Sequence, residues 1–349
     1  MIFTVKLDHR KFSSLMKGKS DYIDVLTKNR EVTFMVYDTG TMSSCVVPVV
    51  TCEDYEDDVY FRLPTKIFLN FLTDDLVEFS ITDTSVFFKF LQKKSSEHYK
   101  FEVRKQVVNF ERFERLLHVR DQVRSGKFAP LDLNELMQFI KLAYYVGGIV
   151  HSDGSVFYCS THNVQLYQET TFRPGQALSI YAKDLLMLSK HGESVWNIEN
   201  MVVSVSDEFI VIVDKVRPTM VSDYNFLVGR KSKKKYTVNL VNALTAIKKL
   251  NYGSTNAEVN FTNKLCRLEA ENCELTVPIS VENTGDSVDS LEDFMKQVDK
   301  PQKEVKIFLS KMQSGLLFGI KSSMIFDIFR DFVKITITPK MFVVISRSV

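Results

Sequence analysis

The side chains that most often perform catalysis or bind metal ions are scattered along this sequence. Asp153, Thr161 and His162 lie close together, and such a trio could activate a hydroxyl group. A histidine placed in a turn is the better account of His162. The acidic pairs Asp57-Asp58 and Asp74-Asp75 fall in predicted turns, where carboxylates end elements more often than they bind metal. We therefore predict no catalytic residue and no metal site. The six histidines are His9, His98, His118, His151, His162 and His191.

Motifs for nucleotide and cofactor chemistry are absent from the sequence. It contains no GxGxxG or GxxxxGK(S/T) loop that would cradle phosphates, and no GxSxG or HExxH motif. The five cysteines show neither CxxC spacing nor a neighbouring histidine pair, which argues against disulfides and zinc. We expect buried thiols in a reducing cytoplasm and no cofactor. The cysteines are Cys45, Cys52, Cys159, Cys266 and Cys273.

The charge of the chain is nearly balanced. Its 45 Lys and Arg against 43 Asp and Glu give a net charge of +2, which carries no overall nucleic-acid signal. Any DNA-binding charge must therefore be segregated on one face. No apolar run approaches the length of a membrane span, and the start MIFTVKLDHRKF reads as a strand rather than a signal peptide. We expect a cytoplasmic protein without membrane contact.

The first third of the sequence alternates strands with two short helices. The second helix begins with proline in its first turn and places Ile67, Phe68, Phe71 and Leu72 on one face. The strands after it are apolar at every second position, as a half-buried sheet requires. The predicted elements are strand Ile2–Lys6, helix Asp8–Lys17, strands Tyr22–Leu26, Val32–Tyr37, Met42–Val50 and Val59–Leu63, helix Pro64–Thr73, and strands Val77–Ile81 and Val86–Phe90.

The same order of elements recurs twice. Asp132 and Glu135 stand at capping-box spacing before the first helix of the middle third. The predicted helices are Asp132–Tyr145 and Ala182–Ser189, then Leu240–Leu250 and Ser310–Leu317; the strands are Val195–Ile198, Met201–Val205, Phe209–Val213, Met324–Phe329, Val333–Thr338 and Met341–Ile345. The period of roughly 110 to 120 residues is longer than that of solenoid repeats. We predict an α+β protein of three tandem domains, 1–115, 116–228 and 229–349.

Three charged segments fall outside the repeated pattern. Glu111–Lys127 and the basic Gly229–Lys235 have the composition of linkers between domains. The acidic and polar Glu282–Glu304 is typical of a mobile surface loop inside the last domain.

Local phrases on these elements resemble the bacterial type of DNA polymerase sliding clamp. They are Phe3-Thr4-Val5 with His9, Tyr144-Tyr145-Val146 with Gly148, Ser160 to Leu166, and Ser222-Asp223-Tyr224. They occur in the family's order, at about its spacing, over nearly the whole chain. Asn163 replaces a family glycine, Ser222 replaces a proline, and the last residues lack the usual Met-Pro pattern. The resemblance is therefore to a divergent member, phage or bacterial, with a partner motif of its own.

The resemblance implies a DNA clamp fold, in which each domain packs two helices on antiparallel sheets. Two chains would form a six-domain ring, a homodimer, with the helices lining the channel. Such a ring acts as a processivity factor that encircles duplex DNA without reading its sequence and tethers DNA polymerase. It also implies a clamp loader as partner and no enzymatic activity.

The predicted helices and their ends carry cations suited to contact phosphates. Acidic residues are fewer there, so a basic lining inside an acidic shell would reconcile DNA binding with the small net charge. Each lysine taken alone is equally well explained as the solvated face of an amphipathic helix. The predicted DNA contacts are Arg10, Lys11, Lys17, Lys66, Lys141, Lys183, Lys190, Lys248, Lys249, Lys311 and Lys321, together with Tyr144 and Tyr145.

The two tyrosines end the first helix of the middle domain, where the family touches DNA. Their rings could stack on bases at a primer junction. Packing in a seam between domains is an equally good explanation for one of them.

The resemblance also implies an apolar groove for partner peptides between the second and third domains. Leu166, Val343 and Ile345 are alternatively ordinary strand core, and Phe226 is the strongest functional candidate because a linker seldom needs a phenylalanine. Carried over position by position, the groove comprises Val146, Thr161, Val164, Leu166, Phe226, Leu227, Val343 and Ile345.

Ring closure would join the first domain of one chain to the third domain of the other. The edge strand His98–Lys105 is expected to pair across that interface, with Phe101 and Leu250 as apolar contacts. Two other readings remain open. One is a monomeric clamp-like processivity factor that binds DNA by a basic face without closing a ring. The other is a structural β-rich protein with no role on DNA; an enzyme has the least support.

Overall fold

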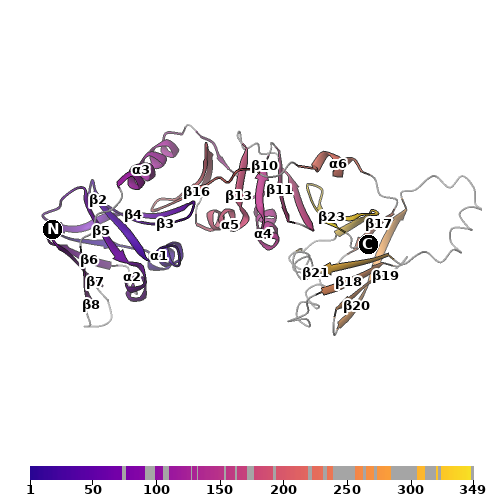
Figure 1. The fold of residues 1–349 in the computed structure, drawn as a ribbon, viewed down its shortest axis with the longest axis horizontal. Coiled ribbons are helices and arrows are strands. Elements are labelled where there is room, and N and C mark those ends of the chain that lie inside the picture. The colour runs from indigo at the N-terminus through magenta and orange to yellow at the C-terminus, as the bar shows by residue number, and fades with distance from the viewer. Residues whose placement is uncertain are drawn as a thin grey trace, which may run out of the picture. The chain divides into compact units, whose positions relative to one another are not determined.

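The chain forms two compact units in a computed structural model (Figure 1). The first unit comprises Met1–Leu133 and Met187–Val216, and the second comprises Asn134–Leu186 and Arg217–Val349. The structure describes residues 1–72, 76–90, 99–104, 110–126, 128–131, 133–152, 155–161, 163–170, 177–191, 194–218, 222–230, 234–238, 256–261, 265–270, 273–283, 305–310, 320 and 324–346.

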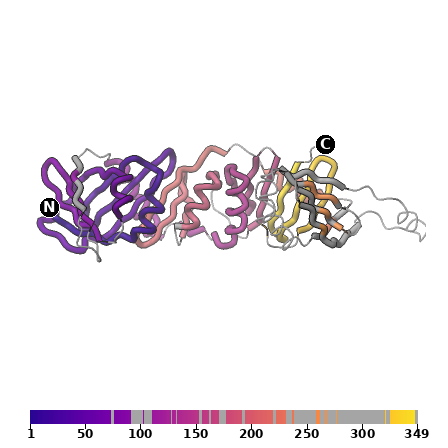
Figure 2. Tube along the Cα trace, turned by 90° about the horizontal axis from the view of Figure 1, so that it is seen from below, coloured from indigo at the N-terminus to yellow at the C-terminus, as the bar shows by residue number. Residues whose placement is uncertain are grey.

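The first unit is built on one antiparallel sheet. Its strands lie in the order β8-β7-β6-β1-β4-β16-β15-β14-β9, while β3 pairs with both β4 and β2, and β2 with β5. Figures 1 and 2 both place β16 beside β4, where the chain returns from its middle third. The strands are β1 (Ile2–Lys6), β2 (Tyr22–Lys28), β3 (Glu31–Asp38), β4 (Thr41–Glu53), β5 (Val59–Pro64), β6 (Leu76–Ile81), β7 (Ser85–Phe90), β8 (Tyr99–Arg104), β9 (Pro130–Leu131), β14 (Ser194–Ile198), β15 (Met201–Val205) and β16 (Phe209–Asp214).

Two short helices pack together on the aromatic core of this unit. They are α1 (His9–Met16) and α2 (Thr65–Phe71), and both confirm the sequence prediction to within two residues at each end. The Phe12 and Phe68 ring centroids lie 5.8 Å apart, and both rings also contact Phe34. These phenylalanines are fully buried, so the helices are held by packing rather than by their own short length.

The segment expected to be a first linker is instead mostly helical. Helix α3 (Phe110–Arg124) buries Phe113, Leu116 and Val119. These side chains join a hydrophobic cluster with residues of β4 and β16, including Met42 and Ile212. The linker interpretation of 111–127 was therefore wrong for most of the segment, because the apolar residues among its charges lie at helical spacing. The helix covers the joint where β4 pairs with β16.

The second unit is built on another antiparallel sheet, with the order β13-β10-β11-β12-β24-β23-β22-β17-β20-β19-β18-β21. The final predicted strands of the chain are confirmed as β22, β23 and β24. The strands are β10 (Ile149–Ser152), β11 (Val156–Thr161), β12 (Val164–Glu169), β13 (Leu178–Tyr181), β17 (Lys234–Val238), β18 (Asn256–Phe261), β19 (Leu265–Ala270), β20 (Cys273–Asn283), β21 (Val305–Ser310), β22 (Met324–Ile328), β23 (Phe332–Thr338) and β24 (Met341–Ser346).

Helix α4 (Met137–Val146) begins later than the sequence predicted. Leu136 stands at its N-cap without a side-chain hydrogen bond. The capping-box prediction was wrong: Glu135 lies before the helix, and its carboxylate accepts a 2.7 Å hydrogen bond from Thr170 Oγ1 instead. Asp132 lies outside the described residues.

The other helices are α5 (Ala182–His191), which was predicted, and α6 (Tyr224–Gly229), which was not. The predicted helix Leu240–Leu250 lies outside the described residues. Ser310 ends strand β21, and the rest of the predicted helix 310–317 is likewise undescribed. No helix in the described part of the chain has both the length and the apolar character needed to cross a membrane.

Both sheets run through the boundaries predicted between domains. Strand β4 of the first predicted domain pairs with β16 of the second, with Phe209 opposite Cys45. Strand β12 of the second pairs with β24 of the third, with Leu166 opposite Val343. Continuous sheets explain why the chain divides into two compact units within the predicted middle domain. The boundaries 1–115, 116–228 and 229–349 stay a prediction.

Candidate functional site

The first helix of the chain separates an apolar face from a basic one. The Asp8 carboxylate caps it by accepting hydrogen bonds from the backbone N–H of Arg10, at 3.2 Å, and Lys11, at 3.1 Å. Phe12 and Leu15 are buried, whereas both cationic side chains are exposed. The helix therefore presents its charge to solvent.

A basic hollow of about 540 Å³ lies where the end of α1 meets α2. Lys17, Lys19 and Lys66 line it together with Asn70, and Asp21 is the one carboxylate among its lining residues. Lys17 and Lys66 are exposed, as the predicted phosphate contacts need to be. Lys19 was not predicted; its Nζ donates a hydrogen bond to Ser43 Oγ.

Helix α4 carries the two predicted stacking residues on its last turn. Tyr144 and Tyr145 are 50% and 53% exposed, and their ring centroids lie 6.1 Å apart. Lys141 is also exposed. The rings are therefore accessible to a ligand in the second unit.

The turn after α4 is fixed by two glycines. Gly147 adopts a positive φ of 76° at the C-cap, a conformation that glycine favours. A Cβ at Gly148 would lie 2.6 Å from the carbonyl oxygen of Ser160 in β11. The close approach of α4 to the sheet thus depends on Gly148.

Of the remaining predicted cations, the structure describes two. Lys183 and Lys190 are exposed on α5, and Lys183 Nζ lies 5.7 Å from the Tyr181 ring centroid. The other predicted contacts, Lys248, Lys249, Lys311 and Lys321, lie outside the described residues.

The sheet at the β12–β24 joint carries different helices on its two faces. Phe139 of α4 contacts Phe157 of β11, with ring centroids 6.3 Å apart. On the opposite face, Tyr167 and Phe342 contact Tyr224 of α6, at 6.2 and 5.8 Å. Side chains alternate along a strand, so Phe157 and Leu166 face α4 while Tyr167 and Phe342 face α6.

The eight predicted groove residues divide between these faces. Val164, Leu166, Val343 and Ile345 are buried on the α4 face, paired across the β12–β24 joint. By alternation Thr161 shares that face, and Val146 is buried at the end of α4. Phe226 and Leu227 belong to α6, on the other face. The described residues therefore do not form the predicted groove as one surface.

The accessible apolar residues lie on the exposed side of α6. Leu227 is buried against Tyr158, Tyr167 and Phe342, which anchors the helix. Phe226 is 64% exposed and Val228 is also exposed, and Arg230 follows the helix as its C-cap. We call the side chains of Phe226, Val228 and Arg230 the α6 surface.

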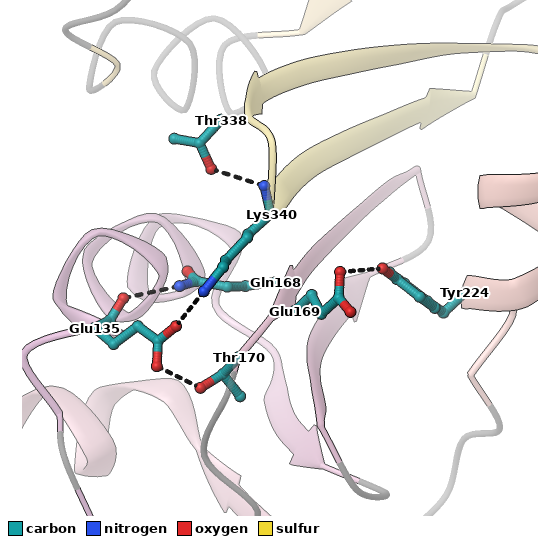
Figure 3. A network of polar contacts seen from close by, with 7 residues as sticks. All are labelled: Glu135, Gln168, Glu169, Thr170, Tyr224, Thr338 and Lys340. Carbon is teal, nitrogen blue, oxygen red and sulfur yellow. Dashed lines mark hydrogen bonds and ion pairs between the residues drawn. The ribbon is translucent and has the colours of Figure 1, made fainter.

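A polar network ties the start of α4 to β12 and to the turn between β23 and β24 (Figure 3). Glu135 Oε1 lies 3.1 Å from Lys340 Nζ, and the Gln168 side-chain amide donates a 2.8 Å hydrogen bond to the Glu135 carbonyl. On the other face, the Tyr224 hydroxyl donates a 3.1 Å hydrogen bond to Glu169. Burial, and then the adjacent Glu169 carboxylate, raise the pKa of Tyr224. These contacts fix both helices to the β12–β24 joint.

Helix α6 and Arg230 were missed in the sequence, although a signal was present. Ser222 and Asp223 are residue types that begin helices, and Gly229 is a residue type that ends them. The segment is only six residues long, and its resemblance to a family junction led to a linker interpretation.

The predicted dimer contacts are described only in part. Strand β8 contains Phe101 opposite Phe88 of β7, and it stands at the end of the sheet order in the described part of the first unit. Leu250 lies outside the described residues. No group of three metal-binding side chains occurs among the residues that the structure places.

Comparison with solved structures identifies the fold. No family model and no curated protein matches the sequence. The structure matches the DNA polymerase III subunit beta of Pseudomonas aeruginosa with a TM-score of 0.68 at 10% identity, covering 100% of both chains. It matches the sliding clamp of Caulobacter crescentus (TM-score 0.69, 10% identity, 100% of both chains). A Helicobacter pylori beta clamp bound to a DNA ligase peptide matches with a TM-score of 0.67, at 10% identity over 100% of both chains.

The chain is therefore an α+β protein with a DNA clamp fold, as predicted. Within that class its architecture is that of the bacterial beta clamp, over its full length.

Proposed function

We propose that this protein is a DNA sliding clamp. Two chains form a ring around duplex DNA, and the ring tethers a DNA polymerase without any catalysis of its own. The observation that carries the proposal is the match to bacterial clamps over the whole of both chains. A topological ring holds DNA for long times while its contacts to phosphates stay weak enough to permit sliding.

The exposed cations on the helices support the DNA-binding part of the proposal. Arg10 and Lys11 on α1, Lys66 on α2, Lys141 on α4 and Lys183 on α5 all reach solvent. Such side chains attract phosphates without reading bases, so we expect binding that weakens steeply as salt rises. We assign Tyr144 and Tyr145 to bases exposed at a primer junction.

The α6 surface is the proposed site for the polymerase and for a clamp loader. Its exposed Phe226 provides an apolar anchor, and a Helicobacter pylori beta clamp of the same fold was solved bound to a DNA ligase peptide. Four of the predicted groove residues are buried on the opposite, α4 face of the sheet, so they stabilise the strands under α6 and do not contact the partner. They are Val164, Leu166, Val343 and Ile345.

Mass in solution and polymerase stimulation test the two parts of the proposal. A ring of two chains requires twice the 40.2 kDa of one chain. Phe226→Ala should abolish stimulation of the polymerase on a long primed template while leaving this mass unchanged. Val50→Ala, which also truncates an exposed apolar residue, should retain stimulation. A monomer in solution, or equal stimulation by the Phe226 variant, would contradict the respective part.

A further inference from the structure

Arg230 is held over aromatic rings at the end of α6. Its guanidinium carbon lies 5.4 Å from the ring centroid of Phe226, 5.4 Å from that of Phe329 and 5.1 Å from that of Phe332. Cation–π contacts orient the guanidinium without neutralising its charge. Within the part of the chain that the structure describes, no ion pair joins Arg230 to a carboxylate. The exposed group remains able to pair with an anion.

The sequence that continues from α6 is strongly cationic. Five of the six residues from 230 to 235 are Arg230, Lys231, Lys233, Lys234 and Lys235. Carboxylates border this region too. Glu282 and Asp327 lie opposite Lys235 on the neighbouring strands, and Glu169 accepts a hydrogen bond from Tyr224. Asp223 begins α6 at its other end, and Asp331 lies in the turn between β22 and β23. Arg230 is the cation that the described residues place on the α6 surface itself, so a ligand there would meet its positive charge.

The α6 surface and the proposed DNA contacts of α4 lie on opposite faces of one sheet. Phe157 contacts α4 and its neighbour Tyr158 packs with Leu227 of α6. Lys141, Tyr144 and Tyr145 are part of α4, so they lie on the face of the sheet opposite to α6. The α6 surface also exposes Phe226 and Val228, which offer nothing to a phosphate backbone. An apolar anchor combined with a cation fits a peptide better than DNA.

We propose that the α6 surface binds an acidic segment of its protein partner. Large apolar side chains of that segment cover Phe226 and Val228, and a carboxylate pairs with Arg230. Charge-assisted pairs of guanidinium and carboxylate supply orientation as well as affinity. The inference names the partner chemistry of the proposed polymerase site and rests on that function.

Peptide binding to the full-length protein tests the inference. The probes are three fluorescein-labelled peptides: one with two leucines flanked by aspartates, one with lysines in place of the aspartates, and one with serines in place of the leucines. Fluorescence anisotropy should detect binding of the first alone, with an affinity that falls as salt rises. Arg230→Gln should weaken that binding about tenfold. Arg230→Lys keeps the charge but loses the planar stack, so its affinity for the first peptide should lie between those of the wild type and Arg230→Gln.

The matched controls separate this surface from a general charge effect. Arg217→Gln removes another exposed arginine of the same unit and should leave peptide binding unchanged. Phe226→Ser should weaken binding of the acidic peptide without changing its salt dependence. Equal binding of the aspartate and lysine peptides would overturn the proposal. So would an Arg230→Gln variant that loses affinity for a labelled DNA duplex but not for the acidic peptide, since the surface would then serve DNA.

This outcome is independent of ring formation. A protein that binds the acidic peptide but forms no ring would retain the inferred site and lose the proposed function. A ring that retains DNA but is indifferent to peptide charge would do the opposite.

Discussion

At the scale of single residues, the accessible chemistry of the second unit depends on a few close contacts. Gly148 lets α4 approach β11, and the exposed tyrosines follow from where that helix ends. His151 is buried beside Tyr158, with Nδ1 2.8 Å from Ser179 Oγ.

Replacing Gly148 tests the first of these contacts. In Gly148→Ala the new Cβ would lie 2.6 Å from the Ser160 carbonyl oxygen, so the backbone must shift. We expect a loss of about 1–3 kcal/mol in the free energy of unfolding, the usual cost of overpacking. Gly229→Ala is the control, because nothing lies within 4 Å of its Cβ position. Urea denaturation measures the free energy of unfolding of both variants, and equal values would contradict this account.

The buried His151 predicts a pH dependence of stability. Burial lowers the pKa of His151 below its usual 6.5 in the folded chain. The unfolded chain therefore takes up this proton first as the pH falls, so stability is full above about pH 6.5 and declines below it. His151→Gln cannot be protonated and should flatten that part of the profile, whereas His118→Gln, at an exposed position, should not. Identical profiles for the wild type and the His151 variant would rule out this contribution.

The sequence could identify some of these residues and not others. The exposed tyrosines and cations were predictable because helical spacing separates them from apolar neighbours. The division of the groove residues between two faces was not, because Leu166 and Phe226 are both apolar and only the pairing of β12 with β24 assigns their sides. Arg230 gives no signal beyond its charge, since its aromatic partners Phe329 and Phe332 lie about a hundred residues away.

At the scale of elements, each joint between sheet segments is covered by a connecting helix. Helix α3 covers the β4–β16 pairing and α6 covers the β12–β24 pairing. Strands were predictable from apolar alternation, as β6 and β7 demonstrate. The connecting helices were missed, because the high charge of α3 and the short length of α6 are also typical of linkers. Tertiary packing on the sheet decides their structure.

Truncating the apolar face of α3 should destabilise the first unit. Leu116 is fully buried, and Leu116→Ala should cost about 2–5 kcal/mol of unfolding free energy through lost burial and a cavity. Glu114→Ala on the exposed side of the same helix should change stability by less than about 0.5 kcal/mol. Urea denaturation measures both. A neutral Leu116 variant would mean that α3 does not stabilise the joint.

At the scale of the whole molecule, the repeated order of elements indicated the fold. The sequence predicted recurring strands and helices, and the structure joins them into sheets that cross the predicted boundaries. A clamp fold with cations exposed on its helices supports enclosure of DNA. Enclosure differs from ordinary electrostatic binding because a closed ring leaves DNA only over an end or by opening.

Retention on DNA of different topology tests enclosure most directly. The protein is loaded onto nicked circular DNA, with a loader present if one is needed, and followed by gel filtration before and after the circle is cut once. The clamp account predicts retention on circles at a salt concentration that abolishes ordinary phosphate binding, and rapid loss after linearisation. Equal loss from circular and linear DNA would show that the protein does not encircle the duplex, and would contradict the account.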